Sequence, residues 1–278
     1  MKTSMQLKAL IRNLSKKTNV EAEILLRSFM LERFLERIAA SKYRRNFILK
    51  GGLLIAAMVG IDTRTTMDMD ATIKGRLLTE PEIKNIIEDI LNTHVDDGVE
   101  FAMREIVEIR EGADYPGFRV SIGAVLDKSR QTLKIDITTG DVITPGEIEY
   151  NFKLMFEDRT ISIMAYNLET VLAEKFETTV SRGVANSRMR DFYDIYILTA
   201  TQPVDASTFR AALQKTEENR GTAEQMADAA GAIQMIAESP IMRILWQRYQ
   251  KKYSYAADVS WDMVIEALKG LAENAGAP

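Results

Sequence analysis

The chain has 278 residues, of which 46% are hydrophobic and 27% charged, and its formal net charge is −4; this composition excludes a disordered chain and allows one large domain or two smaller ones. It contains no cysteine, which excludes thiol nucleophiles, disulfides, cysteine-bound zinc and iron–sulfur clusters. Its single histidine, His94, lies in an expected helix-to-strand loop, so any chemistry must depend on carboxylates, lysines, arginines and hydroxyls.

The N-terminal region is strongly basic. Residues 1–50 contain twelve Lys and Arg but only four Asp and Glu, whereas the rest of the chain has more acidic than basic residues. A basic region on an acidic body indicates a polyanionic partner such as a nucleic acid. An ordinary solvated helix face would give the same pattern, and both interpretations stay open.

A long amphipathic helix is predicted over residues 20–43. Apolar residues recur there at spacings of three, four and seven, and no Gly or Pro interrupts them. Because Arg33, Arg37 and Arg44 recur near one azimuth, we expect part of the basic excess to form a stripe on this helix.

A strand, a glycine pair and a helix are predicted next. Residues 47–49 are typical of a strand, and Gly51-Gly52 opens an apolar segment over residues 53–59. We expect that segment to be a buried helix that ends at Gly60.

A second strand and a capped helix are expected after this first strand and helix. The alternating residues 67–73 predict the strand. Thr79 and Glu82 form a capping-box pattern with Pro81 in the first turn. These signals predict a helix over residues 80–91.

The remaining elements indicate an α+β protein. Strands followed by a run of helices predict a mixed sheet with an N-terminal helix and a helical C-terminal half, divided into domains over residues 1–166 and 167–278. The further strands are expected over residues 99–109, 117–126, 132–138, 152–156 and 161–165. The further helices are expected over residues 167–180, 188–199, 206–216, 222–237, 241–253 and 261–274.

The chain is expected to be a soluble cytoplasmic protein. No stretch approaches the 18–20 or so uninterrupted apolar residues of a membrane span. The first residues lack the apolar core and cleavage site of a signal peptide.

The first candidate site combines the glycine pair with a carboxylate pair. Asp68 and Asp70 are two residues apart in an expected strand, so their side chains lie on the same face and would favour a divalent metal. Gly51 and Gly52 would present backbone N–H groups to a phosphate. Together they indicate metal-dependent handling of a nucleoside triphosphate. Taken alone, the carboxylate pair is better explained by a solvated strand face, and the glycine pair is explained equally well as a packing feature.

A third carboxylate is expected on a neighbouring strand. Asp136 lies on the polar face of the alternating residues 132–138, where it could complete a metal shell and help to deprotonate an attacking hydroxyl. The alternative is again a plain polar strand face.

Two expected helices carry charged residues on apolar faces. Lys175 shares a face with apolar residues and therefore needs a buried anion or a route to solvent. Asp191 and Asp194 share a face with apolar residues and need a cation, which Lys175 or Arg188 could provide. A purely structural salt-bridge network between the helices is the alternative.

In order along the chain, these motifs resemble those of the AbiEii-type nucleotidyltransferases, the toxins of bacterial abortive-infection and type IV toxin–antitoxin modules. The resemblance covers residues 47–196. It rests on Lys50-Gly51-Gly52, Arg64-Thr65-Thr66-Met67-Asp68-Met69-Asp70, Lys134-Ile135-Asp136, Glu174-Lys175 and Arg188-Met189-Arg190-Asp191-Phe192-Tyr193-Asp194.

The resemblance implies roles for these residues within the DNA polymerase β-like superfamily. It implies Mg²⁺ on Asp68 and Asp70, with Asp136 as a third carboxylate, and catalytic roles for Lys175 and Asp191. Nucleotide contacts are implied for Lys50, Gly51, Gly52, Arg64, Lys175, Arg190 and Asp194.

The resemblance also implies a function and its partners. The expected activity is Mg²⁺-dependent transfer of a nucleotidyl group from an NTP to an acceptor hydroxyl, on RNA and above all tRNA, with a cognate antitoxin encoded nearby. One alternative is a non-enzymatic module of the same fold that binds RNA or protein. Another is a metal-dependent nuclease, although hydrolysis of a diester needs no triphosphate cradle.

Overall fold

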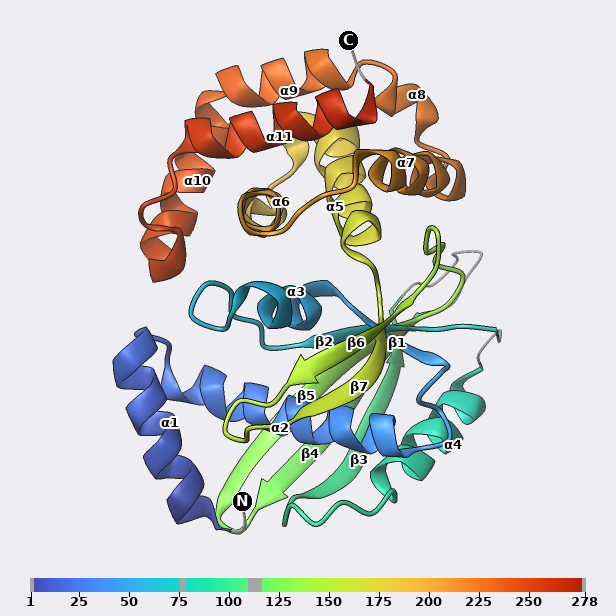
Figure 1. Ribbon diagram of the computed structural model, residues 1–278, viewed down its shortest axis with the longest axis vertical. Coiled ribbons are helices and arrows are strands. Elements are labelled where there is room, and N and C mark those ends of the chain that lie inside the picture. The colour runs from blue at the N-terminus through green and yellow to red at the C-terminus, as the bar shows by residue number, and fades with distance from the viewer. Residues whose placement is uncertain (1–2, 76–78, 110–116, 277–278) are drawn as a thin grey trace. The chain divides into compact units, whose positions relative to one another are not determined.

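The computed structural model describes residues 3–75, 79–109 and 117–276 (Figure 1). These residues form two compact units. The sheet unit holds residues 1–141 and 148–165, and the helical unit holds residues 142–147 and 166–278. Residues 142–147 join the helical unit through hydrogen bonds: the Thr144 N–H donates to the Thr170 hydroxyl at 3.1 Å, and the Asn167 amide donates to the Thr144 carbonyl at 2.8 Å. A domain boundary after residue 166 stays a prediction.

A seven-stranded mixed sheet forms the centre of the sheet unit, in the order β3-β4-β5-β2-β1-β7-β6. The β1/β7 and β2/β5 pairs are parallel and the other pairs antiparallel. This architecture confirms the predicted α+β class. The strands are β1 (Phe47–Lys50), β2 (Met69–Ile73), β3 (Glu100–Glu108), β4 (Gly117–Leu126), β5 (Ser129–Thr138), β6 (Ile148–Lys153) and β7 (Thr160–Ala165).

Four helices belong to this unit: α1 (Ser4–Thr18), α2 (Ala22–Ala40), α3 (Gly51–Val59) and α4 (Glu80–Leu91). α1 packs against α2, whereas the other three pack against strands of the sheet. α2 packs against β5 and β7, and α3 packs against β1 and β2 (Figure 1). The sequence did not predict α1, because its apolar positions are few. Only Leu7 and Ile11 among its large apolar residues are buried, and the Thr3 hydroxyl caps its first turn.

Alternation along β2 and β5 separates an apolar face from a polar one. Met69, Ala71 and Ile135 are fully buried on one face. The residues between them, Asp70 and Asp136, therefore point to the other face of the sheet. Burial of the apolar set fixes the register of both strands, because a slip of one residue would exchange the two faces.

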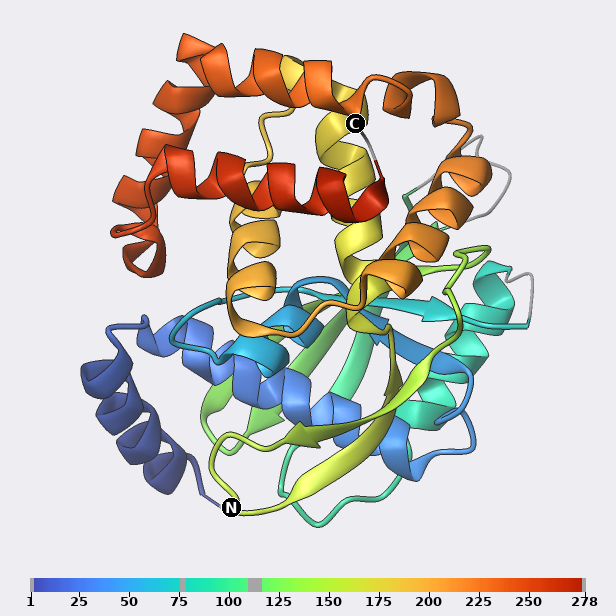
Figure 2. The same ribbon diagram turned by 45° about the horizontal axis from the view of Figure 1, so that its top comes forward.

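Seven helices of four or more residues make up the described part of the helical unit, and α11 packs against α6, α7 and α9 (Figure 2). Its core is aromatic. Trp261 lies 5.6 Å from Phe192 and 6.0 Å from Trp246, measured between ring centroids. The helices are α5 (Leu168–Arg182), α6 (Met189–Thr201), α7 (Ala206–Arg220), α8 (Ala223–Met226), α9 (Ala229–Glu238), α10 (Pro240–Lys252) and α11 (Trp261–Ala275), with 3₁₀ turns at Gly183–Ala185 and Ser254–Ala256.

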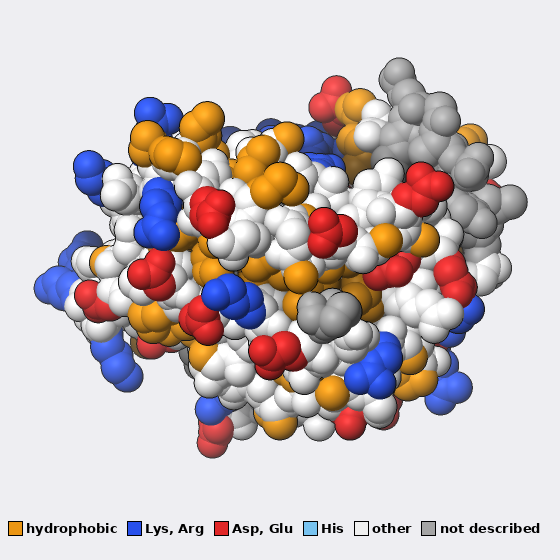
Figure 3. Space-filling model, turned by 90° about the horizontal axis from the view of Figure 1, so that it is seen from above, with side chains coloured by type: hydrophobic (Ala, Val, Ile, Leu, Met, Phe, Trp, Pro, Cys, Tyr) orange, Lys and Arg blue, Asp and Glu red, His pale blue; other side chains and the backbone are white. Residues whose placement is uncertain are grey.

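The surface of the helical unit carries several exposed apolar side chains. Met235, Ile241, Ile244 and Met263 come from α9, α10 and α11. Figure 3 shows hydrophobic side chains gathered in small patches on this surface among scattered charged groups. Throughout the residues described, no helix combines the length and apolar composition that crossing a membrane requires.

Two predicted elements differ from the structure. The expected helix over residues 222–237 is broken into α8 and α9, because the Asp228 side chain accepts the Gly231 N–H and starts a new helix. The strand expected over residues 152–156 occupies Ile148–Lys153 instead. The backbone turns after this strand, where the Met155 N–H donates to the Glu32 carboxylate.

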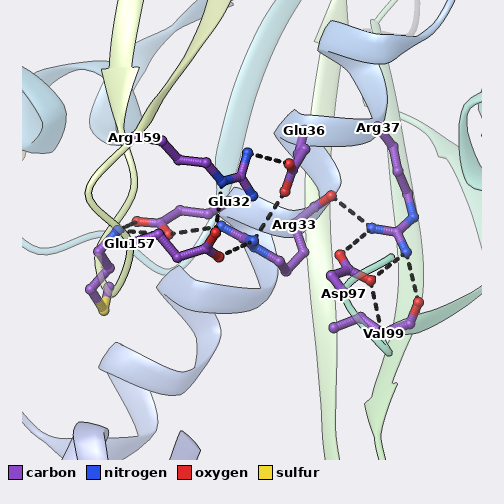
Figure 4. Close-up of polar contacts among 9 residues, drawn as sticks. Glu32, Arg33, Glu36, Arg37, Asp97, Val99, Glu157 and Arg159 are labelled. Carbon is purple, nitrogen blue, oxygen red and sulfur yellow. Dashed lines mark hydrogen bonds and ion pairs between the residues drawn. The ribbon is translucent and has the colours of Figure 1, made fainter. Parts of the chain in front are cut away.

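The predicted basic stripe on the second helix is wrong: Arg33 and Arg37 are buried, and Arg44 lies in the turn beyond the end of α2, where it pairs with Glu149. Arg33 and Arg37 are 1% and 4% exposed and lie in ion pairs (Figure 4). Arg37 binds both oxygens of Asp97, at 2.7 and 3.0 Å, and Arg33 lies 2.7 Å from Glu157. These partners are distant in the sequence, so helical spacing alone could not separate a buried arginine row from a solvated one.

Glu32 sits in the same charged network and is itself unusual. Burial raises the pKa of Glu32 to about 8, although the Met155 N–H and the Arg33 guanidinium act in the opposite direction. Its neighbours Glu36 and Glu157 add like charge, and Arg159 bonds to both of them (Figure 4). The folded protein therefore holds a proton on Glu32 at neutral pH.

We expect stability to fall as the pH rises from about 5 to about 8. The unfolded chain loses the Glu32 proton near its ordinary pKa of 4.5, whereas the folded protein keeps it to about pH 8. Within this window the folded state binds more protons, so the free energy of unfolding decreases with pH, by at most about 1.4 kcal/mol per pH unit. Urea denaturation at several pH values across this range measures the free energy of unfolding. That free energy should change less steeply with pH for Glu32→Gln than for the native protein. Equal slopes would contradict the account.

Candidate active site

The turn between β1 and α3 is built around two glycines. Gly51 has φ +66°, and a Cβ there would lie 2.8 Å from Asp70 Cγ. A Cβ on Gly52 would lie 2.8 Å from the Thr66 hydroxyl oxygen and 3.3 Å from Arg64 Nη2. Only glycine permits this backbone conformation and these contacts together. The turn, the Asp70 carboxylate and residues 64–66 therefore form one packed assembly.

A row of four charged residues crosses the sheet beside this turn. In the strand register, Lys50 is opposite Asp70, Asp70 is opposite Asp136, and Asp136 is opposite Arg119. Residues opposite one another share a face, so two carboxylates lie between two cations. Asp70 and Asp136, predicted from separate motifs, are thus neighbours on adjacent strands.

Arg119 holds Asp136 by a two-point contact. Its Nε and Nη2 each donate to one Asp136 oxygen at 2.7 Å. The hydrogen bonds to Asp136 raise the pKa of Arg119 above its ordinary value, and the charges of Asp68 and Asp70 add to the effect. Sequence reasoning missed Arg119, whose place opposite Asp136 depends on the β4/β5 register.

Lys50 is buried beside a second carboxylate that sequence reasoning missed. Its ammonium lies 2.7 Å from Asp141, just beyond the end of β5. Burial alone would raise the pKa of Asp141, but the Lys50 charge and hydrogen bonds from Lys50, Thr138 and Thr72 outweigh burial and hold it below its ordinary value. The Thr-Thr-Gly-Asp sequence after the Asp136 strand was the available signal.

Asp68 and Arg64 occupy the loop that leads into β2. The strand expected over residues 67–73 begins only at Met69, so Asp68 lies outside it and strand alternation does not place its side chain. Asp68 is half-buried, and its carbonyl accepts the Thr66 hydroxyl at 3.1 Å. Arg64 is 2% exposed and donates to the Thr65 carbonyl. This burial favours a role for Arg64 in supporting the glycine turn over direct contact with a nucleotide.

The carboxylates fit a divalent cation only as a pair. Among the described residues, no three Asp, Glu or His side chains converge closely enough to hold one ion. Asp68 and Asp70 flank the start of β2, both of their charges act on Arg119, and the glycine turn brings the backbone against Asp70. Asp136 is engaged by Arg119. Two carboxylates with room for substrate phosphates are the donor set that Mg²⁺ usually takes.

A second charged cluster lies wholly within the helical unit. The Lys175 ammonium lies 2.8 Å from a carboxylate oxygen of both Asp191 and Asp194, and Arg188 lies 3.5 Å from Asp191. Burial disfavours the charged lysine, but Asp194 and Asp191 outweigh it and raise the pKa of Lys175. The predicted pairing of these residues is confirmed. Their catalytic and nucleotide-binding roles stay predictions.

Arg190 lies beside the second cluster and contacts a tyrosine. Its Nη2 donates to the Tyr253 hydroxyl at 3.1 Å, and its guanidinium carbon lies 5.7 Å from the centre of that ring. Sequence reasoning assigned Arg190 to the nucleotide and did not notice Tyr253. The only signal was the Lys-Lys-Tyr-Ser-Tyr run at the end of α10.

We expect Gly51→Ala to disable the glycine turn. The added methyl meets Asp70 and the residue must keep φ +66°, so the free energy of unfolding should fall by about 1–2 kcal/mol and activity should drop. Gly146→Ala is the control, because a Cβ there meets nothing within 4 Å. Thermal denaturation and activity measurements on both variants check the prediction. Equal behaviour of the two would contradict it.

Solved structures of similar fold include nucleotidyltransferase-like proteins. A candidate nucleotidyltransferase of Helicobacter pylori is 14% identical with TM-score 0.52, and the match covers 92% of this chain and 95% of that chain. JHP933 of H. pylori is 12% identical over 92% of each chain with TM-score 0.48. An antigenic nucleotidyltransferase-like protein of Paracoccidioides brasiliensis is 14% identical with TM-score 0.41, over 74% of this chain and 93% of that one. The first of these supports the nucleotidyltransferase fold.

Comparison with protein families gives a more specific result than the fold. No curated protein matches the chain. The family described as nucleotidyl transferase AbiEii toxin, type IV TA system, matches residues 33–267. That span contains the glycine turn, the row of charged residues on the sheet and the Lys175 cluster. The chain therefore belongs to the AbiEii family of nucleotidyltransferase toxins of type IV toxin–antitoxin systems.

Proposed function

We propose that this nucleotidyltransferase moves a nucleotidyl group from an NTP to a hydroxyl of an RNA acceptor, specifically a tRNA, with Mg²⁺ as its metal. The observation that carries the proposal is the glycine turn packed against Asp70, in the same row as Asp136. A backbone turn suited to phosphate thus lies beside carboxylates suited to a metal.

Asp68 and Asp70 are the residues that would hold Mg²⁺. When bound, the ion would neutralise triphosphate charge and make the α-phosphorus a better electrophile. Lys50 sits beside Asp70 in the row and is 2.7 Å from Asp141, which fixes its position. This ammonium limits the repulsion between the carboxylates and an incoming triphosphate.

The chemical step is an in-line displacement. The acceptor hydroxyl oxygen forms a bond to the α-phosphorus, the bond from that phosphorus to the bridging oxygen of the β-phosphate breaks, and pyrophosphate leaves with the bonding electron pair. Asp136 would accept the hydroxyl proton, since carboxylate oxygens keep further lone pairs when Arg119 occupies one on each. Backbone N–H groups of Gly51 and Gly52 would hold the triphosphate.

The helical cluster would contribute charge to the same reaction. Lys175 would contact phosphates, with Asp191 and Asp194 holding its ammonium in place. Arg190 would act as a further cation near the nucleotide. Stabilising charge that develops on phosphate oxygens is a large part of phosphoryl-transfer catalysis.

Exposed basic residues on α1 support an RNA acceptor. Lys8, Arg12 and Lys16 recur every four residues, so they share one face of that helix, and all three are exposed. They line a groove between α1 and α2 with a volume of about 530 Å³. Since Arg33 and Arg37 are buried, this face replaces the predicted stripe as the candidate contact for RNA phosphates. Such contacts should be sensitive to salt.

Membership of a type IV toxin–antitoxin family implies a cognate antitoxin. We propose that the antitoxin is encoded beside this chain and that the transfer reaction is the toxic activity. Growth inhibition would then depend on transfer of the nucleotidyl group to the acceptor RNA.

Transfer can be tested with NTPs labelled at either end of the triphosphate. Purified protein, total tRNA and Mg²⁺ should incorporate label from the α-position but not from the γ-position, and EDTA should prevent incorporation. Absence of incorporation by the native protein would overturn the proposal. Shortened RNA would indicate a nuclease instead.

A further inference from the structure

A basic pocket opens in the helical unit where α6 packs against α10. Its volume is about 390 Å³, within the range of about 300–1,000 Å³ that small-molecule pockets occupy. The residues that matter in its lining are four cations and two aromatic side chains: Arg188, Arg190, Arg248, Lys252, Tyr249 and Tyr253.

The pocket has a net positive charge that the protein does not neutralise. Asp191 is its single acidic lining residue, and that carboxylate already lies 2.8 Å from the Lys175 ammonium. Within the described part of the chain, Arg248 and Lys252 form no ion pair, and both are exposed. The N-terminal end of α6 adds partial positive charge. The pocket therefore suits an anion.

Aromatic rings form one wall of the same pocket. Tyr253 is half-buried, and its ring centroid lies 4.7 Å from that of Tyr249 and 5.3 Å from that of Tyr255, which is stacked on it. The Lys252 ammonium lies 5.4 Å from the centre of the Tyr253 ring. Arg190 fixes the hydroxyl of Tyr253 from another side. The ring is thus held in place by packing and hydrogen bonding before any ligand arrives.

A planar ring beside Arg248 and Lys252, which form no ion pair among the described residues, fits one class of ligand, a nucleotide within a single strand. An aromatic side chain stacks on any base, and cations beside it bind the phosphate backbone. The pocket has no glycine turn and no carboxylate pair for a metal, so it suits a monophosphate link better than a triphosphate.

We propose that this pocket binds a nucleotide of the acceptor RNA, with its phosphate on Arg248 and Lys252 and its base on the ring of Tyr253. This assignment rests on the proposed transfer of a nucleotidyl group to RNA. It adds α10 to the substrate-binding surface. No functional residue was predicted on this helix from the sequence. The pocket would position the acceptor strand and take no part in bond formation.

Binding can be measured without the reaction. Fluorescence anisotropy is measured with a 5′-labelled single-stranded RNA of six nucleotides, in EDTA and without NTP. Under these conditions it reports binding of the RNA strand alone. The double variant Arg248→Ala/Lys252→Ala should weaken binding about tenfold and lower the slope of log Kd against log salt by about 1.4, since two phosphate contacts are lost. The control Lys251→Ala removes an exposed cation from the same helix that does not line the pocket, and should bind as the native protein does.

The aromatic wall is tested separately. Tyr253→Leu should weaken binding about fivefold or more, whereas Tyr253→Phe keeps the ring and should retain most of the affinity. Thermal denaturation of both variants shows whether either disturbs the fold, and the phenylalanine variant keeps the test valid if the leucine variant unfolds.

Three outcomes would overturn the assignment. In the first, the double variant and Lys251→Ala bind RNA equally well. In the second, the double variant loses NTP binding but not RNA binding. In the third, polyglutamate displaces the RNA as effectively as unlabelled RNA, which would indicate an acidic protein partner.

The pocket and the proposed function can fail independently. If the native protein binds RNA through this pocket but incorporates no label, the transfer proposal fails and the pocket stands. If it incorporates label and the pocket variants bind RNA as the native protein does, the pocket assignment fails and transfer stands.

Discussion

Asp70→Asn should reduce label transfer at least about 10³-fold, because one of the two proposed metal ligands loses its charge. The substitution keeps the shape of the side chain beside Gly51 and removes one of two neighbouring carboxylates from the sheet. We therefore expect the fold to persist and only the chemistry to be lost. Transfer from α-labelled NTP to tRNA measures the activity, and thermal denaturation measures the fold.

Asp158→Asn is the matched control for this prediction. Asp158 belongs to the same unit, is exposed and lies in the turn between β6 and β7, away from the charged row. It should transfer label at the native rate. Asp70→Asn activity within about tenfold of native would contradict the proposed metal site.

Lys175→Met should destabilise the helical unit by about 3–5 kcal/mol, because it removes the ammonium that lies 2.8 Å from both Asp191 and Asp194. Asp194 is fully buried, so water cannot solvate its carboxylate once the Lys175 ammonium is removed. Chemical denaturation followed by tryptophan fluorescence is suitable, since Trp246 and Trp261 lie in this unit. Lys215→Met removes a surface ion pair with Glu218 and should cost less than about 1 kcal/mol.

A double variant separates the structural role of Lys175 from its proposed contact with phosphates. Lys175→Met/Asp194→Asn removes one of the two buried negative charges and should recover part of the lost stability. Transfer activity should not recover, because the phosphate contact is still missing. Recovery of both would show that Lys175 serves only to hold the fold, and a single variant within 1 kcal/mol of native would contradict the ion-pair account.

Local sequence patterns predicted those parts of the site whose residues are close to one another in the sequence. The glycine pair, the polar strand faces that carry Asp70 and Asp136, and the Lys175 helix are all of this kind, because strand alternation and helical period determine which side chains share a face. Asp68 lies in the loop before β2, so strand alternation does not place it. Arg119 was missed because its contact with Asp136 depends on the β4/β5 register. Asp141 was missed because its contact with Lys50 joins residues 91 positions apart.

The basic helix shows a second limit of sequence reasoning. A row of arginines at helical spacing has the same pattern whether solvent or carboxylates face it. For Arg37 the deciding partner is Asp97, 60 positions further along the chain, and for Arg33 it is Glu157, 124 positions away. The structure therefore moves the candidate RNA contacts to α1 and to the pocket between α6 and α10.

The intact mass of purified tRNA after incubation with each NTP in turn tests the central proposal most directly. With the native protein, Mg²⁺ and the correct NTP, the tRNA should gain the mass of one or more nucleoside monophosphate residues, and Asp70→Asn should leave it unchanged. A tRNA mass that stays constant with every NTP, or that falls through cleavage, would contradict the proposed transfer.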